Sequence, residues 1–276
     1  TMNIYFDCGL YNEEMQFAYQ KSEKLFIRLL RDFEIHCLRE IYVADNEHFD
    51  KTCWMLEEKL FGFSSNKQAS ATIIGRCMEV KEAEYKQLLI IKCEVFLPII
   101  VELSDSNFKT KMSIDRRTDL IIHQSFYHEL FHLQEMEQRA KVGLTINCLV
   151  PNLLENSKKF WTEYYAERKS NEIFDIEERK TINLQKKFYD FMEERSKLSI
   201  DELLYNLTHF LAVKSEVSDE EVENELNKFI VLKKSTQNLL KYNVILKEMY
   251  KNFPVISKED IQKIEIILEK IIYDLQ

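Results

Sequence analysis

The sequence contains few of the residues that interrupt regular secondary structure. Only four glycines and three prolines occur among its 276 residues. Glycine supplies the backbone conformations of many tight turns, and proline ends or kinks helices. We therefore expect a helix-rich fold with few tight turns.

Long apolar runs and a secretory leader pattern are also missing. The most apolar stretch, residues 88–101, is interrupted by Lys92, Glu94 and Pro98. A membrane span needs about 20 apolar residues, so we interpret this stretch as a buried strand. Residues 2–20 lack the basic start and apolar centre of a signal peptide. The sequence therefore predicts a cytoplasmic protein that does not bind membranes.

Excess positive charge and metal-type cysteine pairs are absent as well. The net charge is −9, whereas a nucleic-acid groove needs a basic face. We therefore expect no nucleic-acid partner. The six cysteines, at positions 8, 37, 53, 77, 93 and 148, form no C-x-x-C pair, so reduced thiols are expected.

The most informative feature present is the stretch from His128 to His132, which reads H-E-x-x-H inside a helical pattern. Residues four apart lie on one face of a helix, one turn from each other. Two imidazoles at that spacing can bind one zinc ion, and Glu129 can then act on a zinc-bound water. We predict His128 and His132 as metal ligands and Glu129 as the catalytic base. Ordinary surface or core histidines are the alternative.

A second helical stretch, residues 160–168, offers a third ligand. Glu163 follows His132 at a distance that lets the chain turn and return beside the first helix. Glu167 lies one turn further on the same face, where it could accept a hydrogen bond from a zinc-bound histidine. We predict Glu163 as the third ligand and Glu167 as its supporting residue. An exposed acidic stripe is the alternative.

This combination resembles the gluzincin metallopeptidases, especially the ImmA/IrrE-like family. The resemblance covers roughly residues 36–175 and rests on H-E-x-x-H followed by Glu163-x-x-Ala166. It implies zinc bound by His128, His132 and Glu163, with Glu129 as general base. The chain departs from the family pattern at Phe131, where a glycine is usual. Cys93 suggests a rival layout like that of peptide deformylases, but Cys93 lies in an apolar stretch and fits a core residue better.

The order of patterns predicts an α+β fold with a zincin-like domain at residues 1–178 and an all-helical region at 179–276. In the first part we expect helices at 12–33, 45–60 and from 115 or 119 to 137. Strands are expected at 37–44, 71–80 and 85–96, with a polar loop at 62–70. In the second part, capping boxes at Ser199, Ser218 and Ser257 each predict the start of a helix.

These features favour an intracellular zinc peptidase with a narrow set of protein or peptide substrates. One alternative is a zinc-binding sensor or partner-binding regulator, and another is a structural protein with a coincidental motif. The helical region could mediate homo-oligomerisation or bind a regulatory partner. Side chains that could stabilise an oxyanion are His123, Tyr127, Tyr164, Tyr165, Arg168 and His209, although His123 points away from the ligand face.

Overall fold

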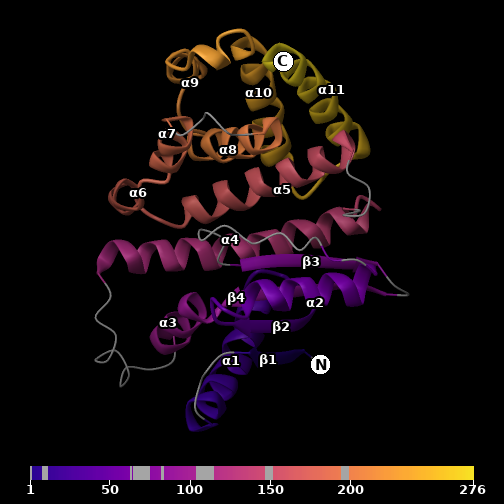
Figure 1. Cartoon of the computed structure of the whole chain (residues 1–276), viewed down its shortest axis with the longest axis vertical. Helices are drawn as coiled ribbons and strands as arrows, with labels where there is room; N and C mark the ends of the chain where they lie inside the picture. Colours follow the sequence, from indigo (N-terminus) through magenta and orange to yellow (C-terminus); the bar gives the residue numbers. More distant parts are fainter. Residues whose placement is uncertain are drawn as a thin grey trace. The chain divides into compact units, whose positions relative to one another are not determined.

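The computed structural model describes residues 2–7, 12–62, 64, 75–81, 84–103, 115–146, 152–193 and 199–276. It confirms the α+β prediction, because a four-stranded mixed sheet in the N-terminal part is followed by a mostly helical region (Figure 1). The elements are β1 (Asn3–Asp7), α1 (Asn12–Asp32), β2 (Leu38–Ala44), α2 (Phe49–Phe61), β3 (Gly75–Lys81), β4 (Tyr85–Lys92), α3 (Cys93–Leu103), α4 (Arg116–Lys141), α5 (Leu153–Glu172), α6 (Ile176–Ile182), α7 (Gln185–Glu193), α8 (Ile200–Val213), α9 (Asp219–Leu226), the 3-10 helix η2 (Ile230–Leu232), α10 (Thr236–Asn252) and α11 (Lys258–Leu275).

Contacts divide the chain into two compact units, residues 1–137 and 138–276. Helix α4 continues across this division. The domain boundary predicted after residue 178 falls inside the second unit, where α5 packs against α8 and α11. That boundary stays a prediction.

The sheet of the first unit has the strand order β1-β2-β4-β3, in which β3 alone runs antiparallel to its neighbour. Strand β4 is buried on both faces. Leu89 and Ile91 pack with apolar residues of α1, α3 and α4, whereas Leu88 and Ile90 pack with α2. Successive side chains of a strand point to opposite faces, so an uninterrupted apolar run belongs in the middle of a covered sheet.

The expected strand at 85–96 is wrong in its last part, because β4 ends at Lys92 and Cys93 begins α3. In a short run whose residues are mostly apolar and buried, the periodicity cannot separate strand from helix. Cys93 is buried in the core, as expected. Strand β1 was not predicted. It is five residues long and pairs in parallel with β2, from which it is separated in the sequence by the whole of α1.

Side chains tie α4 to the sheet and to the segment that enters it. The buried Gln87 Nε2 of β4 donates to the Leu133 carbonyl at 2.7 Å. The Glu137 carboxylate accepts the backbone N–H groups of His36, at 2.7 Å, and Cys37, at 3.0 Å, just before β2 begins. These bonds satisfy buried polar groups and fix how far α4 can rotate or slide on the sheet.

In the second unit, α5 is deeply buried at Trp161, Tyr164, Tyr165 and Ala166, each at most 1 % exposed. The three predicted capping boxes are confirmed at the starts of α8, α9 and α11. A fourth, at Asp175, was not predicted. No strand occurs after residue 175 within 175–193 and 199–276, as expected.

Among the helices of the described residues, none is both long enough and apolar enough to cross a membrane.

We expect Glu137→Ala to lower the free energy of unfolding by about 2–4 kcal/mol, because two backbone N–H groups would lose a charged acceptor that is 2 % exposed. Chemical denaturation measures the change. The exposed Lys141 on the same helix offers a control, since Lys141→Ala should shift stability by no more than about 0.5 kcal/mol. Equal effects of the two substitutions would contradict the anchoring role of Glu137.

Candidate metal centre

An apolar stripe determines the orientation of helix α4 about its own axis. Ile122, Phe126, Leu130 and Leu133 recur at three- and four-residue steps and belong to the core beneath the sheet. Their burial sets which face of α4 turns away from the core. The two histidines of the motif are outside this apolar cluster, on the remaining face.

The imidazoles of His128 and His132 converge on one point. Their Nε2 atoms are 2.8 Å apart, and the rings are nearly perpendicular at 85°. Two nitrogens bound to one tetrahedral zinc ion lie about 3.3 Å apart. A separation change of about half an ångström would therefore accommodate a metal ion. His132 is 5 % exposed, whereas His128 is partly exposed, so one side of this position remains open to solvent.

The side chain of Glu129 lies against β3. Its Oε2 is 3.2 Å from Cys77 Sγ. A Cβ added at Gly75 would come within 2.4 Å of Glu129 Cγ and 2.8 Å of Oε1. Strand β3 therefore passes directly beside this carboxylate, which is 7 % exposed. A glycine is needed there because any side chain would displace Glu129.

In the second unit, α5 presents Glu163 and Glu167 to α8. His209 of α8 lies between them, with Nε2 at 3.2 Å from Glu163 and Nδ1 at 3.0 Å from Glu167. The Tyr205 hydroxyl donates to the same Glu163 oxygen at 3.3 Å. Burial lowers the pKa of His209, but its hydrogen bonds with the two glutamates outweigh burial and raise that pKa above its ordinary value. A protonated imidazole can donate to both carboxylates at once.

One ligand atom each of His128, His132 and Glu163 lies within 4.8 Å of the others. The described residues thus contain a His-His-Glu group that could hold a metal ion. Its donor set, two imidazole nitrogens and one carboxylate oxygen, fits a zinc ion with an open fourth position. Cys93, the alternative ligand, is buried in the core and is not in this group.

The predicted supporting residue, Glu167, makes a hydrogen bond with His209. Its predicted bond to a ligand histidine stays a prediction. The sequence indicates His209 only as a possible oxyanion stabiliser and does not indicate Tyr205 as a site residue. The signal was present, because Tyr205 and His209 are four residues apart, the same spacing as Glu163 and Glu167. Which two helices would face each other could not be read from that spacing.

The other residues considered for oxyanion stabilisation have structural partners. Tyr127 stacks on Phe33, and His123 Nδ1 lies 2.9 Å from the Asp119 carbonyl. Burial raises the pKa of Tyr164 to about 12, partly offset by Arg168. Arg168 itself lies over the Tyr250 ring at 3.8 Å, and Tyr165 packs on Phe253 with ring centroids 4.2 Å apart.

Comparisons of this chain with protein family models, with curated proteins and with solved structures return no match. The resemblance to gluzincins therefore rests on the motif residues and their spacing.

We expect His128→Ala or His132→Ala to abolish metal retention and Glu163→Gln to weaken it severely, because each change removes one of the three candidate ligands. Elemental analysis of freshly purified, dialysed protein measures retention. His123→Ala is the matched control, since His123 lies on the same helix outside the ligand group and should leave retention unchanged. Full occupancy in Glu163→Gln would assign the third ligand to Glu167 or another carboxylate.

Proposed function

We propose that this chain is a zinc-dependent peptidase that hydrolyses peptide bonds in a narrow set of protein substrates. The observation that carries the proposal is the His128, His132 and Glu163 group together with Glu129, the residue that follows the first histidine. Two histidines, one carboxylate and a separate acidic residue are the components of zinc peptidase chemistry.

In this scheme His128, His132 and Glu163 would hold the ion. Zinc bound there would lower the pKa of a coordinated water toward about 7 and polarise the carbonyl of the substrate. Glu129 is outside the ligand group, so its carboxylate remains available for proton transfer. It would take a proton from the attacking water and deliver it to the leaving amine, so the same carboxylate would be restored at the end.

Strand β3 supports a site for an extended substrate. It is an edge strand in the part of the sheet that the structure describes, and an extended peptide can add to such an edge by main-chain hydrogen bonds. Gly75 and Cys77 on β3 contact Glu129. A peptide aligned along β3 would therefore pass beside the proposed base.

Narrow specificity is proposed from the helical region. Residues 179–276 contribute His209 and Tyr205 near Glu163, but most of their helices are not required by the hydrolytic chemistry. Such a region can restrict which substrates enter or bind one particular protein. We therefore expect poor activity on generic unfolded proteins.

We expect Glu129→Gln to retain zinc and fold while hydrolysis falls by a factor of roughly 10² or more, because the amide cannot accept the proton. One measurement compares the newly formed protein termini in a cell lysate treated with wild type or with Glu129→Gln. A second measures the metal content of both proteins. Only a few sites should appear with wild type.

Three other outcomes would change this conclusion. Normal cleavage by Glu129→Gln would contradict the role of Glu129. Many unrelated cut sites would overturn narrow specificity and leave the zinc chemistry intact. An absence of new termini, with zinc bound, would favour a zinc-binding sensor or regulator.

A further inference from the structure

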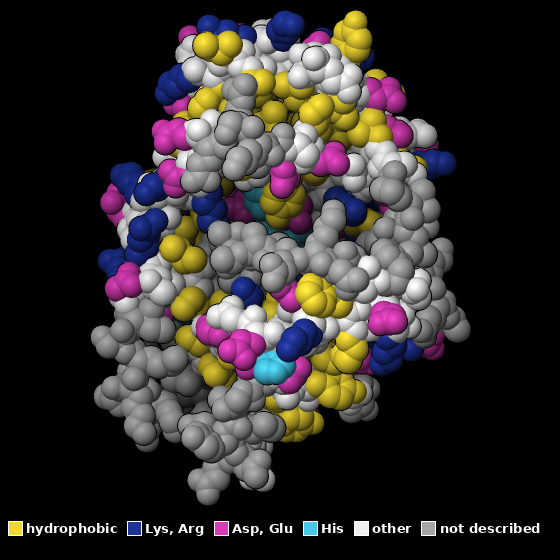
Figure 2. Space-filling view, viewed as in Figure 1, with side chains coloured by type: hydrophobic (Ala, Val, Ile, Leu, Met, Phe, Trp, Pro, Cys, Tyr) yellow, Lys and Arg dark blue, Asp and Glu magenta, His cyan; other side chains and the backbone are white. Residues whose placement is uncertain are grey.

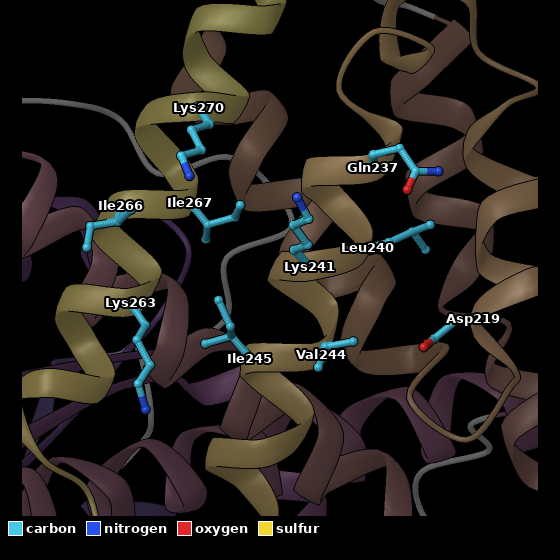
Figure 3. A pocket seen from close by; sticks show the side chains of 10 residues that line it. All are labelled: Asp219, Gln237, Leu240, Lys241, Val244, Ile245, Lys263, Ile266, Ile267 and Lys270. Atoms are coloured by element: carbon cyan, nitrogen blue, oxygen red, sulfur yellow. The ribbon is translucent and has the colours of Figure 1, made fainter.

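A groove of about 550 Å³ runs between α10 and α11 in the helical unit (Figure 3). Its floor and walls are apolar. Ile267 is almost fully buried, whereas Ile266 is 54 % and Val244 is 39 % exposed. Figure 2 shows a band of hydrophobic side chains over the helical unit, with charged side chains around it. Aliphatic side chains left accessible in a concave surface favour binding of another apolar surface.

The rim of this groove is mainly basic. In Figure 3, Lys270 lies next to Ile267 on α11 and Lys241 lies on the neighbouring helix α10. Lys263 lies about two turns from Lys270 along α11 and pairs with Asp260 at 2.8 Å, so Lys241 and Lys270 carry the basic character of the rim. Among the lining residues the one carboxylate is Asp219, which already pairs with Lys247 at 3.0 Å. The chain as a whole carries −9. A basic rim on an acidic protein selects an acidic partner through complementary potential.

We propose that the groove binds an amphipathic helix of a partner protein with acidic residues on both sides of its apolar stripe. A groove between two helices accepts the apolar face of a third, with anchors at i, i+3 or i+4, and i+7. Acidic residues beside those anchors would meet Lys241 and Lys270. A second copy of this chain fits less well, because a two-fold contact would bring the same lysines together. This inference is independent of the zinc chemistry.

The test uses a fluorescent helical peptide of about 18 residues, five turns, with leucines along one face and glutamates beside them. A control peptide has lysines in place of the glutamates. We expect saturable binding of the acidic peptide only, measured by fluorescence anisotropy on the full chain. Lys241→Glu combined with Lys270→Glu should weaken binding at least roughly tenfold, and Ile266→Glu should abolish it.

Ile230→Glu is the matched control, because Ile230 is 81 % exposed and is not among the groove residues. It should bind the peptide normally, and thermal unfolding should show that all variants remain folded. The proposal is overturned if the acidic peptide does not saturate or if both peptides bind equally. It is also overturned if sedimentation shows a dimer that Ile266→Glu dissociates, since the groove would then bind a second copy.

A separate observation concerns the proposed base and rests on the proposed function. Cys77 Sγ lies 3.2 Å from Glu129 Oε2 and 3.4 Å from the Glu129 carbonyl oxygen. Gly75 lies two residues earlier on the same face of β3, and its missing side chain leaves the space that Glu129 occupies. We infer that Cys77 is a positioning residue, which holds the carboxylate of Glu129 through a weak thiol hydrogen bond.

The test compares Cys77→Ala, which removes the donor, with Cys77→Ser, which keeps one. Crystal structures should show the Glu129 carboxylate displaced in the alanine variant and retained in the serine variant. On a substrate found in the lysate comparison, Cys77→Ala should lower kcat by a factor between roughly 10 and 100 with KM unchanged. Cys77→Ser should restore most of it, and Cys77→Ala should add no loss to Glu129→Gln.

The two readouts separate this inference from the proposed function. An unmoved carboxylate in Cys77→Ala would overturn the positioning role, whatever the activity. A displaced carboxylate in a protein whose wild type cleaves nothing would keep the positioning role and refute the peptidase proposal.

Discussion

The attachment of α4 to the sheet is the constraint on which the candidate metal centre depends. His128, Glu129 and His132 all lie on this helix, so a rotation of α4 would move every one of them together. Its apolar stripe is buried in the core of the first unit, and the bonds from Gln87 and to His36 and Cys37 fix its position along the sheet. Burial of this stripe stabilises the attachment in proportion to the apolar area removed from water, but the interaction is not directional. The hydrogen bonds add direction, since each buried donor has few acceptors within reach.

In the second unit, the carboxylates of Glu163 and Glu167 lie close together in a partly buried place. Glu163 and Glu167 lie on one face of α5, where like charges repel each other. His209 offsets this repulsion by bonding to both, at 3.2 and 3.0 Å. This contact depends on the register of α8 against α5, because a shift of one turn would separate the imidazole from one of the glutamates.

Local patterns predicted the parts of the fold in which one sequence segment determines its own conformation. Helix α1 and strand β2 agree with their amphipathic patterns, and three capping boxes begin helices as expected. The predictions were wrong or missing where contacts with residues distant in the sequence determine the conformation. Strand β1 is too short to be recognised alone and is stabilised by β2. The apolar run through Cys93 changes from strand to helix at a point that its own residues do not mark, because apolar residues on both sides of Cys93 are buried.

By itself, the sequence determined the spacing of His128 and His132, which any helix converts into two imidazoles on one face. It also determined the helical character of the segment that carries Glu163 and Glu167. Only the tertiary structure decided that Glu129 lies against Gly75 and Cys77 of β3, and that His209 lies between the two glutamates. The physical reason is range. A periodic pattern records which face of an element avoids water, but which side chains meet across two such faces depends on how whole elements pack.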